Sequence, residues 1–179
     1  MSVFVSIIVA LILLFCFTAF TGAPFVPSKK RDLKKLFNSG YQLTKKDTVI
    51  DLGAGSGTVM HMSISHGAKV IGLELNPVLA IITKLRFLRQ PRATVKCCNF
   101  YNYKFPPATT VVYAFADSRD IKKIYDKVRR ESARLNKPLT LISYAFKLPD
   151  IKPTQKSGPF FIYKLKSPVV GSSEISSKH

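Results

Sequence analysis

Two periods of apolar and polar positions run along residues 31–166. Short runs rich in β-branched and aromatic residues predict strands, and apolar positions three or four residues apart predict helices between them. Because strands that alternate with helices pair in parallel through right-handed crossovers, we expect an open, Rossmann-like α/β sheet with helices on both faces. The expected strands are 48–52, 68–73, 93–98, 109–116 and 138–146, and the expected helices are 31–37, 58–66, 77–89 and 120–135.

The last expected helix is amphipathic. Its apolar side chains are Ile121, Ile124, Tyr125, Val128 and Leu135. Its outer side is expected to be basic, because most of the basic residues lie away from the apolar face; these are Lys122, Lys123, Lys127, Arg129, Arg130 and Arg134. Beyond residue 146 the alternation stops. The run 159–166 is expected to add one antiparallel strand, and residues 167–179 are expected to form a flexible polar tail.

The amino end departs from the pattern of an ordinary globular domain. From Val3 to Phe20 only Ser6 and Thr18 are polar. At about 1.5 Å per residue such a helix covers about 27 Å, close to the roughly 30 Å of a bilayer core. We therefore expect a transmembrane anchor over residues 1–23. A cleaved signal peptide is the alternative, but the basic region that it needs is missing and Pro24 disfavours cleavage after residue 23.

Positive charge follows the anchor directly and runs through the whole chain. Five basic residues lie within residues 29–35, which predicts a cytoplasmic domain and contact with anionic lipid head groups. The chain has 28 Lys and Arg against 10 Asp and Glu, a net charge of +18, with 46% apolar residues, which excludes a disordered chain. We expect an anchor (1–23), a basic juxtamembrane segment with the first helix (24–47), one catalytic domain (48–166) and the tail.

A glycine-rich turn after the first strand carries the candidate chemistry. Asp51 stands in the strand, and Gly53, Ala54, Gly55 and Gly57 follow it before the next helix. The next strand leads to Glu74, at the distance where a carboxylate accepts hydrogen bonds from ribose hydroxyls. Glycines let a ligand approach the backbone closely, so the turn and the acid together indicate a nucleoside site.

The details of the turn distinguish two classes of cofactor. A dinucleotide site uses G-x-G-x-x-G and places a pyrophosphate on the turn. This chain has G-x-G-x-G preceded by Asp51, and an acid there would repel pyrophosphate but suits an amino group and a sulfonium. The turn resembles the first motif of class I S-adenosylmethionine-dependent methyltransferases. The resemblance implies that Leu75, Asn99 and Phe100 complete the cofactor site.

A finer resemblance concerns the substrate. The segments 24–27 (PFVP), 49–57 (VIDLGAGSG) and 72–77 (GLELNP) are similar to those of membrane-associated protein-lysine methyltransferases that modify the ATP synthase c subunit and the adenine nucleotide translocase. That family implies methyl transfer to a lysine ε-amine of a membrane-embedded protein. Where the family has Asp-Leu-Trp after the third strand, this chain has Asn99, Phe100 and Tyr101.

Side chains at the ends of the fourth and fifth expected strands could form the acceptor slot. Tyr113, Phe115 and Phe146 would wall it, and Asp117 and Tyr144 are the candidate catalytic residues. An apolar slot favours the neutral form of a lysine amine, and Asp117 could orient the ammonium or accept its proton. Alternatively, Tyr113 and Phe115 belong to an ordinary alternating core face, and Asp117 caps the next helix. No metal is required by this chemistry.

Two other functions remain open from the sequence. The charge of +18 fits an RNA or other nucleic-acid methyltransferase, although Phe115-Ala116-Asp117-Ser118 stands where adenine-amino methyltransferases carry Asn/Asp-Pro-Pro-Tyr/Phe. Asn99 in place of an acid fits a non-catalytic module of the same fold. Cys97 and Cys98 are expected to be buried strand residues.

Overall fold

The computed structural model describes residues 3–9, 12 and 28–166 of the chain, and residues 3–9 are helical. Seven strands form one sheet in the order β3-β2-β1-β4-β5-β7-β6. The strands are β1 Thr48–Leu52, β2 Lys69–Glu74, β3 Ala93–Cys97, β4 Val111–Ala114, β5 Leu139–Tyr144, β6 Gln155–Ser157 and β7 Phe160–Leu165. The first five pair in parallel, and β7 runs antiparallel to both β5 and β6. The expected Rossmann-like sheet is confirmed.

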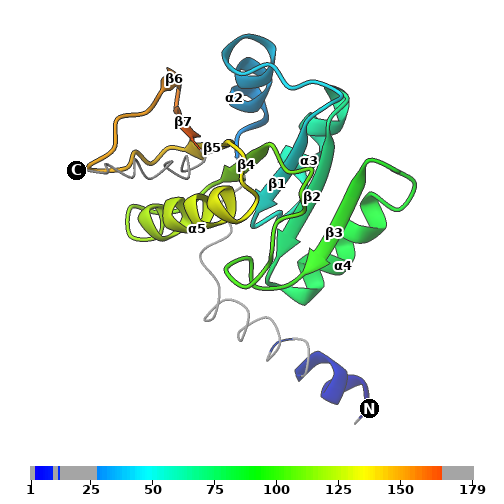
Figure 1. The fold of residues 1–179 in the computed structure, drawn as a ribbon. Coiled ribbons are helices and arrows are strands. Elements are labelled where there is room, and N and C mark those ends of the chain that lie inside the picture. Colours follow the sequence, from blue (N-terminus) through cyan, green and yellow to red (C-terminus); the bar gives the residue numbers. More distant parts are fainter. Residues whose placement is uncertain (1–2, 10–11, 13–27, 167–179) are drawn as a thin grey trace, which may run out of the picture.

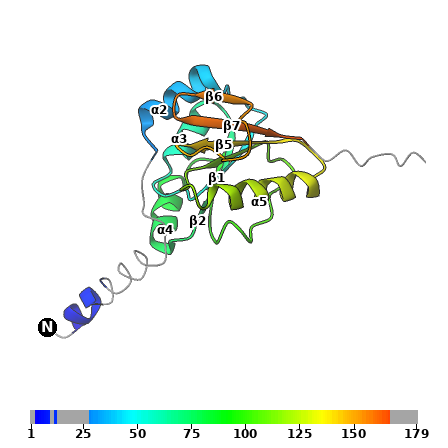
Figure 2. The same ribbon diagram turned by 90° about the vertical axis from the view of Figure 1, so that its left-hand side faces the viewer.

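Helices cover both faces of the sheet, as expected. The helices are α2 Lys30–Lys35, the π-helical turn η1 Leu36–Gly40, α3 Thr58–Ser65, α4 Pro77–Arg86 and α5 Ile121–Arg134. Helices α3 and α4 lie on one face and α5 lies on the other (Figures 1 and 2). Alternate residues of each central strand supply the two cores: Val49 packs with α3, whereas Ile50 packs with α5. This alternation follows from the two-residue period of a strand.

The first helix is part of the folded domain. Leu33, Leu36 and Phe37 are at most 1% exposed and join the core on the α3 face. Further along the chain, α4 ends at Arg86 instead of residue 89. Strand β6 was missed from the sequence because its three residues are polar and at least partly exposed.

Helix α5 has exposed basic residues, as expected, but Lys127 is not one of them. This residue is 5% exposed, and its ammonium donates to Glu131 at 3.0 Å and to the carbonyl of Tyr103 at 2.8 Å. Glu131 also accepts from the backbone N–H of Phe105 at 2.9 Å and pairs with Arg134 at 2.6 Å. Burial alone would raise the pKa of Glu131, but the hydrogen bonds from Arg134 and Lys127 hold it below its ordinary value. The cluster pins the segment between β3 and β4 against α5.

Three further expectations concern other parts of the chain. The anchor at residues 1–23 and the tail at 167–179 lie mostly or wholly outside the described residues. Within the described ranges, no helix has the length and apolar character needed to cross a bilayer. Cys97 is exposed and Cys98 is half-buried, so the expected burial of both cysteines is wrong. Cys97 ends β3, the strand at the edge of the sheet, and Cys98 follows it, so fewer neighbours cover both residues.

Candidate nucleoside-binding and acceptor site

The predicted site residues gather at the carboxyl ends of four neighbouring strands. The order β2-β1-β4-β5 places Glu74, the glycine turn, Phe115 and Tyr144 in sequence along one edge of the sheet. With strands about 4.8 Å apart, the edge from Glu74 to Tyr144 spans roughly 14 Å. Ligands of open α/β sheets bind beyond this edge.

The glycine turn is held close to strand β2. Gly53, Gly55 and Gly57 all have positive φ, at 85°, 51° and 78°. The backbone N–H groups of Gly53 and Ala54 both donate to the carbonyl of Leu73 at 2.9 Å. A Cβ added at Gly53 would meet nothing within 4 Å, whereas one at Gly57 would lie 2.5 Å from Phe87. Gly57 therefore serves packing, and Gly53 leaves room above the turn.

Glu74 faces the glycine turn. One carboxylate oxygen accepts from the backbone N–H of Gly55 at 2.8 Å, and the other accepts from the N–H of Asn76 at 2.8 Å. Each carboxylate oxygen has a second acceptor position, so Glu74 keeps capacity for two ribose hydroxyls. Asn76 caps α4 by accepting from the N–H groups of Val78 and Leu79.

Asp51 is buried beneath the turn. It is 2% exposed, and its Oδ2 atom has no hydrogen-bond partner among the described residues. Burial, and to a lesser extent the negative charge of Glu74, raise the pKa of Asp51 to about 7. A buried carboxylate without a partner is costly, so this group is suited to a cationic or hydrogen-bond-donating ligand.

The segment after β3 bounds the site on the β2 side. Phe100 in this segment is half-buried, and its ring centroid lies 4.3 Å from that of Tyr101. Leu75, directly after β2, is 53% exposed. Asn99 is exposed, and its side-chain oxygen accepts from the N–H of Tyr101 at 2.9 Å. The Tyr101 hydroxyl is buried without a partner among the described residues. Sequence reasoning gave Tyr101 no role, and no sequence signal indicates that its hydroxyl is orphaned.

An aromatic wall closes the β4–β5 side. Phe115 contacts Tyr144 edge to face at 4.8 Å between ring centroids, and it stacks on Phe146 at 6.5 Å. Ala145, between Tyr144 and Phe146, has a φ of 67°, a conformation that costs a non-glycine residue about 1 kcal/mol or more. The strained residue turns both neighbouring rings toward Phe115, which indicates a shaped site.

The segment before α2 and the helix itself hold this wall in place. The Tyr144 hydroxyl donates to Asp32 at 3.1 Å, and Ser28 is 2.7 Å from the hydroxyl of Tyr113. Burial, followed by the hydrogen bond and charge of Asp32, raises the pKa of Tyr144. Sequence reasoning missed both contacts because they join residues more than 80 positions apart.

Asp117 lies in the turn before α5. Its carboxylate accepts from the backbone N–H groups of Arg119 and Asp120, and it pairs with the Arg119 guanidinium at 2.7 Å. The Arg119 hydrogen bond lowers the pKa of Asp117. An ionised carboxylate fits the orienting role better than the proton-accepting one. The backbone contacts of Asp117 hold the turn at residues 118–120, whereas the N-cap of α5 is Asp120, whose side chain makes no capping hydrogen bond.

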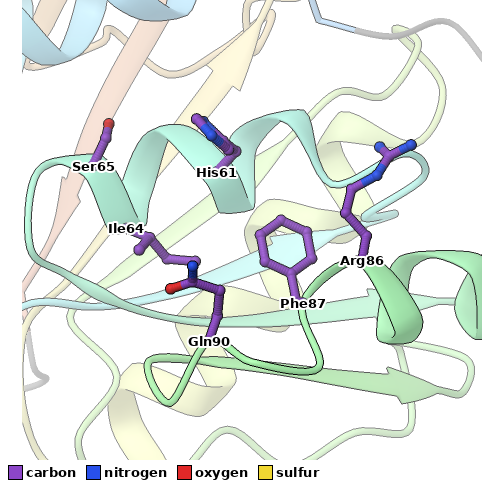
Figure 3. A pocket seen from close by; sticks show the side chains of 6 residues that line it. All are labelled: His61, Ile64, Ser65, Arg86, Phe87 and Gln90. Atoms are coloured by element: carbon purple, nitrogen blue, oxygen red, sulfur yellow. The ribbon is translucent and has the colours of Figure 1, made fainter.

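A shallow cavity of about 170 Å³ lies elsewhere, between α3 and the end of α4. Its lining comes from His61, Ile64, Ser65, Arg86, Phe87 and Gln90 (Figure 3). None of these residues belongs to the predicted site, and ligand pockets for small molecules usually exceed about 300 Å³. Among the described residues, no three or more His, Cys, Asp and Glu side chains gather as a metal site would require.

Comparisons of sequence place the chain near methyltransferases without fixing a family. No protein-family model matches the chain. Ribosomal RNA small subunit methyltransferase A of Thermotoga maritima is 33% identical over 66 residues, which are 37% of this chain and 24% of that protein. The match thus spans about a quarter of the length of this curated relative.

Comparisons of structure identify the fold. An RNA methyltransferase of Salinibacter ruber in complex with S-adenosyl-L-homocysteine superposes with a TM-score of 0.64 at 17% identity, over 83% of this chain and 98% of that one. A dimethyladenosine transferase of Plasmodium falciparum gives 0.55 at 18% identity, over 67% and 43%. Geranyl diphosphate methyltransferase in complex with S-adenosylmethionine gives 0.52 at 18%, over 65% and 50%. The chain has the fold of class I methyltransferases.

Proposed function

We propose that the chain is an S-adenosylmethionine-dependent methyltransferase that binds its cofactor at the carboxyl ends of β1 and β2. The observation that carries the proposal is the 2.8 Å hydrogen bond from Gly55 to Glu74, which joins the turn to the acid beside the open space over Gly53. Solved structures of similar fold contain S-adenosylmethionine or S-adenosylhomocysteine, which supports this choice of cofactor.

The residues present fit this cofactor. Glu74 would accept from the ribose hydroxyls, and the orphaned Asp51 Oδ2 would receive the amino group. Gly53, Ala54 and Gly55 would border the ligand, with Leu75, Asn99 and Phe100 near its base, whereas Gly57 packs against Phe87. The cofactor supplies a methyl group already activated by a positive sulfur, so the protein needs to position the acceptor and exclude water.

RNA is the acceptor that the comparisons favour. The sequence relative and two of the three structural relatives described above carry RNA or dimethyladenosine in their names. The net charge of +18 suits a polyanion, and Lys122 and Arg130 on α5 are exposed without an ion pair among the described residues. The aromatic wall of Phe115, Tyr144 and Phe146 could stack an unpaired base.

A lysine of a membrane protein is the second candidate. The PFVP and GLELNP segments and the apolar sequence from Val3 to Phe20 support it. In this case, the anchor would hold the domain at the cytoplasmic face of a membrane, and the exposed basic side chains of residues 29–35 would meet anionic lipid. The aromatic wall would desolvate the lysine and lower its pKa, while Asp117 would orient its ammonium.

One labelling experiment separates the two acceptors. The full chain is incubated with methyl-labelled S-adenosylmethionine, total RNA and native membranes, and the label is then measured in RNA and in protein. Label in RNA that RNase removes supports the first candidate, and label in lysines of membrane proteins supports the second. At cofactor concentrations below the dissociation constant, Glu74→Gln should reduce either signal by at least roughly tenfold, whereas Asp126→Asn on the outer side of α5 should not. No label above the Glu74→Gln background would overturn the proposed activity.

A further inference from the structure

Helix α4 turns its aliphatic side chains outward. Val78, Ile81, Ile82 and Leu85 are 41–64% exposed, and their spacing places them on one helical face. Leu75 before the helix and Leu88 after it extend this aliphatic stripe, with 53% and 72% exposure. Soluble helices normally turn such a face toward the core, so this stripe indicates a partner outside the domain.

The contacts of α4 with the sheet explain why its aliphatic face points outward. Its buried residues are the small Ala80 and the polar Thr83, whose hydroxyl donates to the carbonyl of Gly55 at 2.5 Å. Thr83 and Phe87 pack closely against Gly57. The inner face of α4 is therefore used to support the glycine turn, and the aliphatic stripe is not needed for the core.

The charge around the aliphatic stripe is positive. Between Glu74 and Asp117 the chain has no Asp or Glu, but it has six Lys and Arg. Lys84, Arg86 and Arg89 on or just after α4 are exposed. This combination of exposed aliphatic and basic side chains, without acids, suits an anionic lipid surface. The aliphatic side chains would enter the boundary of the acyl chains, and the basic side chains would meet the head groups.

The place where the chain enters the domain agrees with this surface. Ser28 is held by Tyr113 of β4, toward the carboxyl edge of the sheet, and α4 begins at that edge directly after Glu74. The apolar sequence Val3 to Phe20 precedes Ser28. A membrane-inserted amino end would thus hold the domain within reach of the same bilayer.

We propose that α4 docks on an anionic bilayer through its aliphatic stripe, as a second membrane contact besides the amino end. RNA is a poor match for a row of leucine and isoleucine side chains, and a second copy of this chain would bring basic edges together. Docking along α4 sets the nucleoside end of the site beside the lipid surface, whichever acceptor is methylated.

The proposal is tested with the full chain in vesicles that contain phosphatidylglycerol. Cys16, Cys97 and Cys98 are replaced by alanine, and an environment-sensitive fluorophore is attached at Leu85→Cys. A matched label at Lys123→Cys, whose native side chain is 69% exposed on α5, reports the opposite face. We expect a blue shift and quenching by brominated lipid at position 85, with neither at position 123. Both native side chains are exposed, so both variants should fold.

Each other outcome counts against the proposal. A label at position 85 that brominated lipid does not quench would overturn it. A blue shift without such quenching would place the amino-terminal segment or a second copy on the stripe, and dependence on the protein-to-lipid ratio would identify the copy. As a second readout, adding Ile81→Gln and Leu88→Gln should reduce the quenching, whereas adding Arg130→Gln should not.

Discussion

Replacing Asp51 with asparagine should stabilise the ligand-free protein at alkaline pH. The carboxyl group is buried with an orphaned Oδ2, and its pKa is raised from 3.8 to about 7. Below about pH 4 the folded and unfolded states both bind the proton. Between pH 4 and 7 only the folded state binds it, so stability falls as pH rises. A pKa shift of three units corresponds to about 4 kcal/mol, which is the upper bound on the folding stability that ionised Asp51 costs the parent chain at pH 8.

The assay is urea unfolding of the full chain in mild detergent at pH 4, 6 and 8, monitored by circular dichroism. The stability difference between Asp51→Asn and the parent should grow with pH in favour of the variant. Asp126→Asn, at a partly exposed carboxylate paired with Arg129, is the control and should show little change. A difference that stays constant from pH 4 to 8 would refute the raised pKa.

The same variant should bind the cofactor more weakly. An amino group beside Asp51 favours its ionised form, so ligand binding expels the proton and tightens as pH rises through about 7. In Asp51→Asn this pH dependence should be lost. Gain of stability together with loss of affinity would identify Asp51 as a binding residue, since a purely structural residue would lose both.

The remaining predictions concern backbone strain and the buried ion cluster. Gly57→Ala should lower the unfolding free energy by about 3 kcal/mol, because residue 57 has a positive φ and the added Cβ clashes with Phe87. Gly53→Ala should lower it by only about 1 kcal/mol but should weaken cofactor binding. Urea unfolding and calorimetry of the two variants measure these effects. Ala145→Gly should raise the unfolding free energy by about 1 kcal/mol, and a lower urea midpoint would contradict the strain at this position. Glu131→Ala should lower the unfolding free energy by about 3–5 kcal/mol, because the buried Lys127 ammonium loses its carboxylate partner. A loss under about 1 kcal/mol would contradict the role of the cluster.

The sequence carried the order of strands and helices and the glycine turn. The hydrophobic period located β1 at its observed bounds, and α4 begins at residue 77, where the sequence pattern predicted a helix to start. These features are local, so the pattern of neighbouring residues determines them. The likeness of the fold to class I methyltransferases also agrees with the cofactor that the motif suggested.

Long-range features could not be predicted in this way. Lys127 has the spacing of an outer residue on α5, yet the segment between β3 and β4 folds over it. Helix α4 is apolar on most sides, so the sequence did not show that Ala80 and Thr83 would face the sheet. Which of these side chains become buried depends on which helices, strands and loops pack against each other. The identity of the acceptor depends on side chains from four elements and was least accessible.

The binding of the nucleoside by Glu74 and the glycine turn is tested most directly by calorimetry with S-adenosylhomocysteine. The full chain should bind it in the micromolar range, Glu74→Gln should weaken binding by at least roughly tenfold, or about 1.4 kcal/mol, and Asp126→Asn should leave it unchanged. Absence of binding to the parent chain at millimolar ligand, or equal affinity of the parent and Glu74→Gln, would contradict the account.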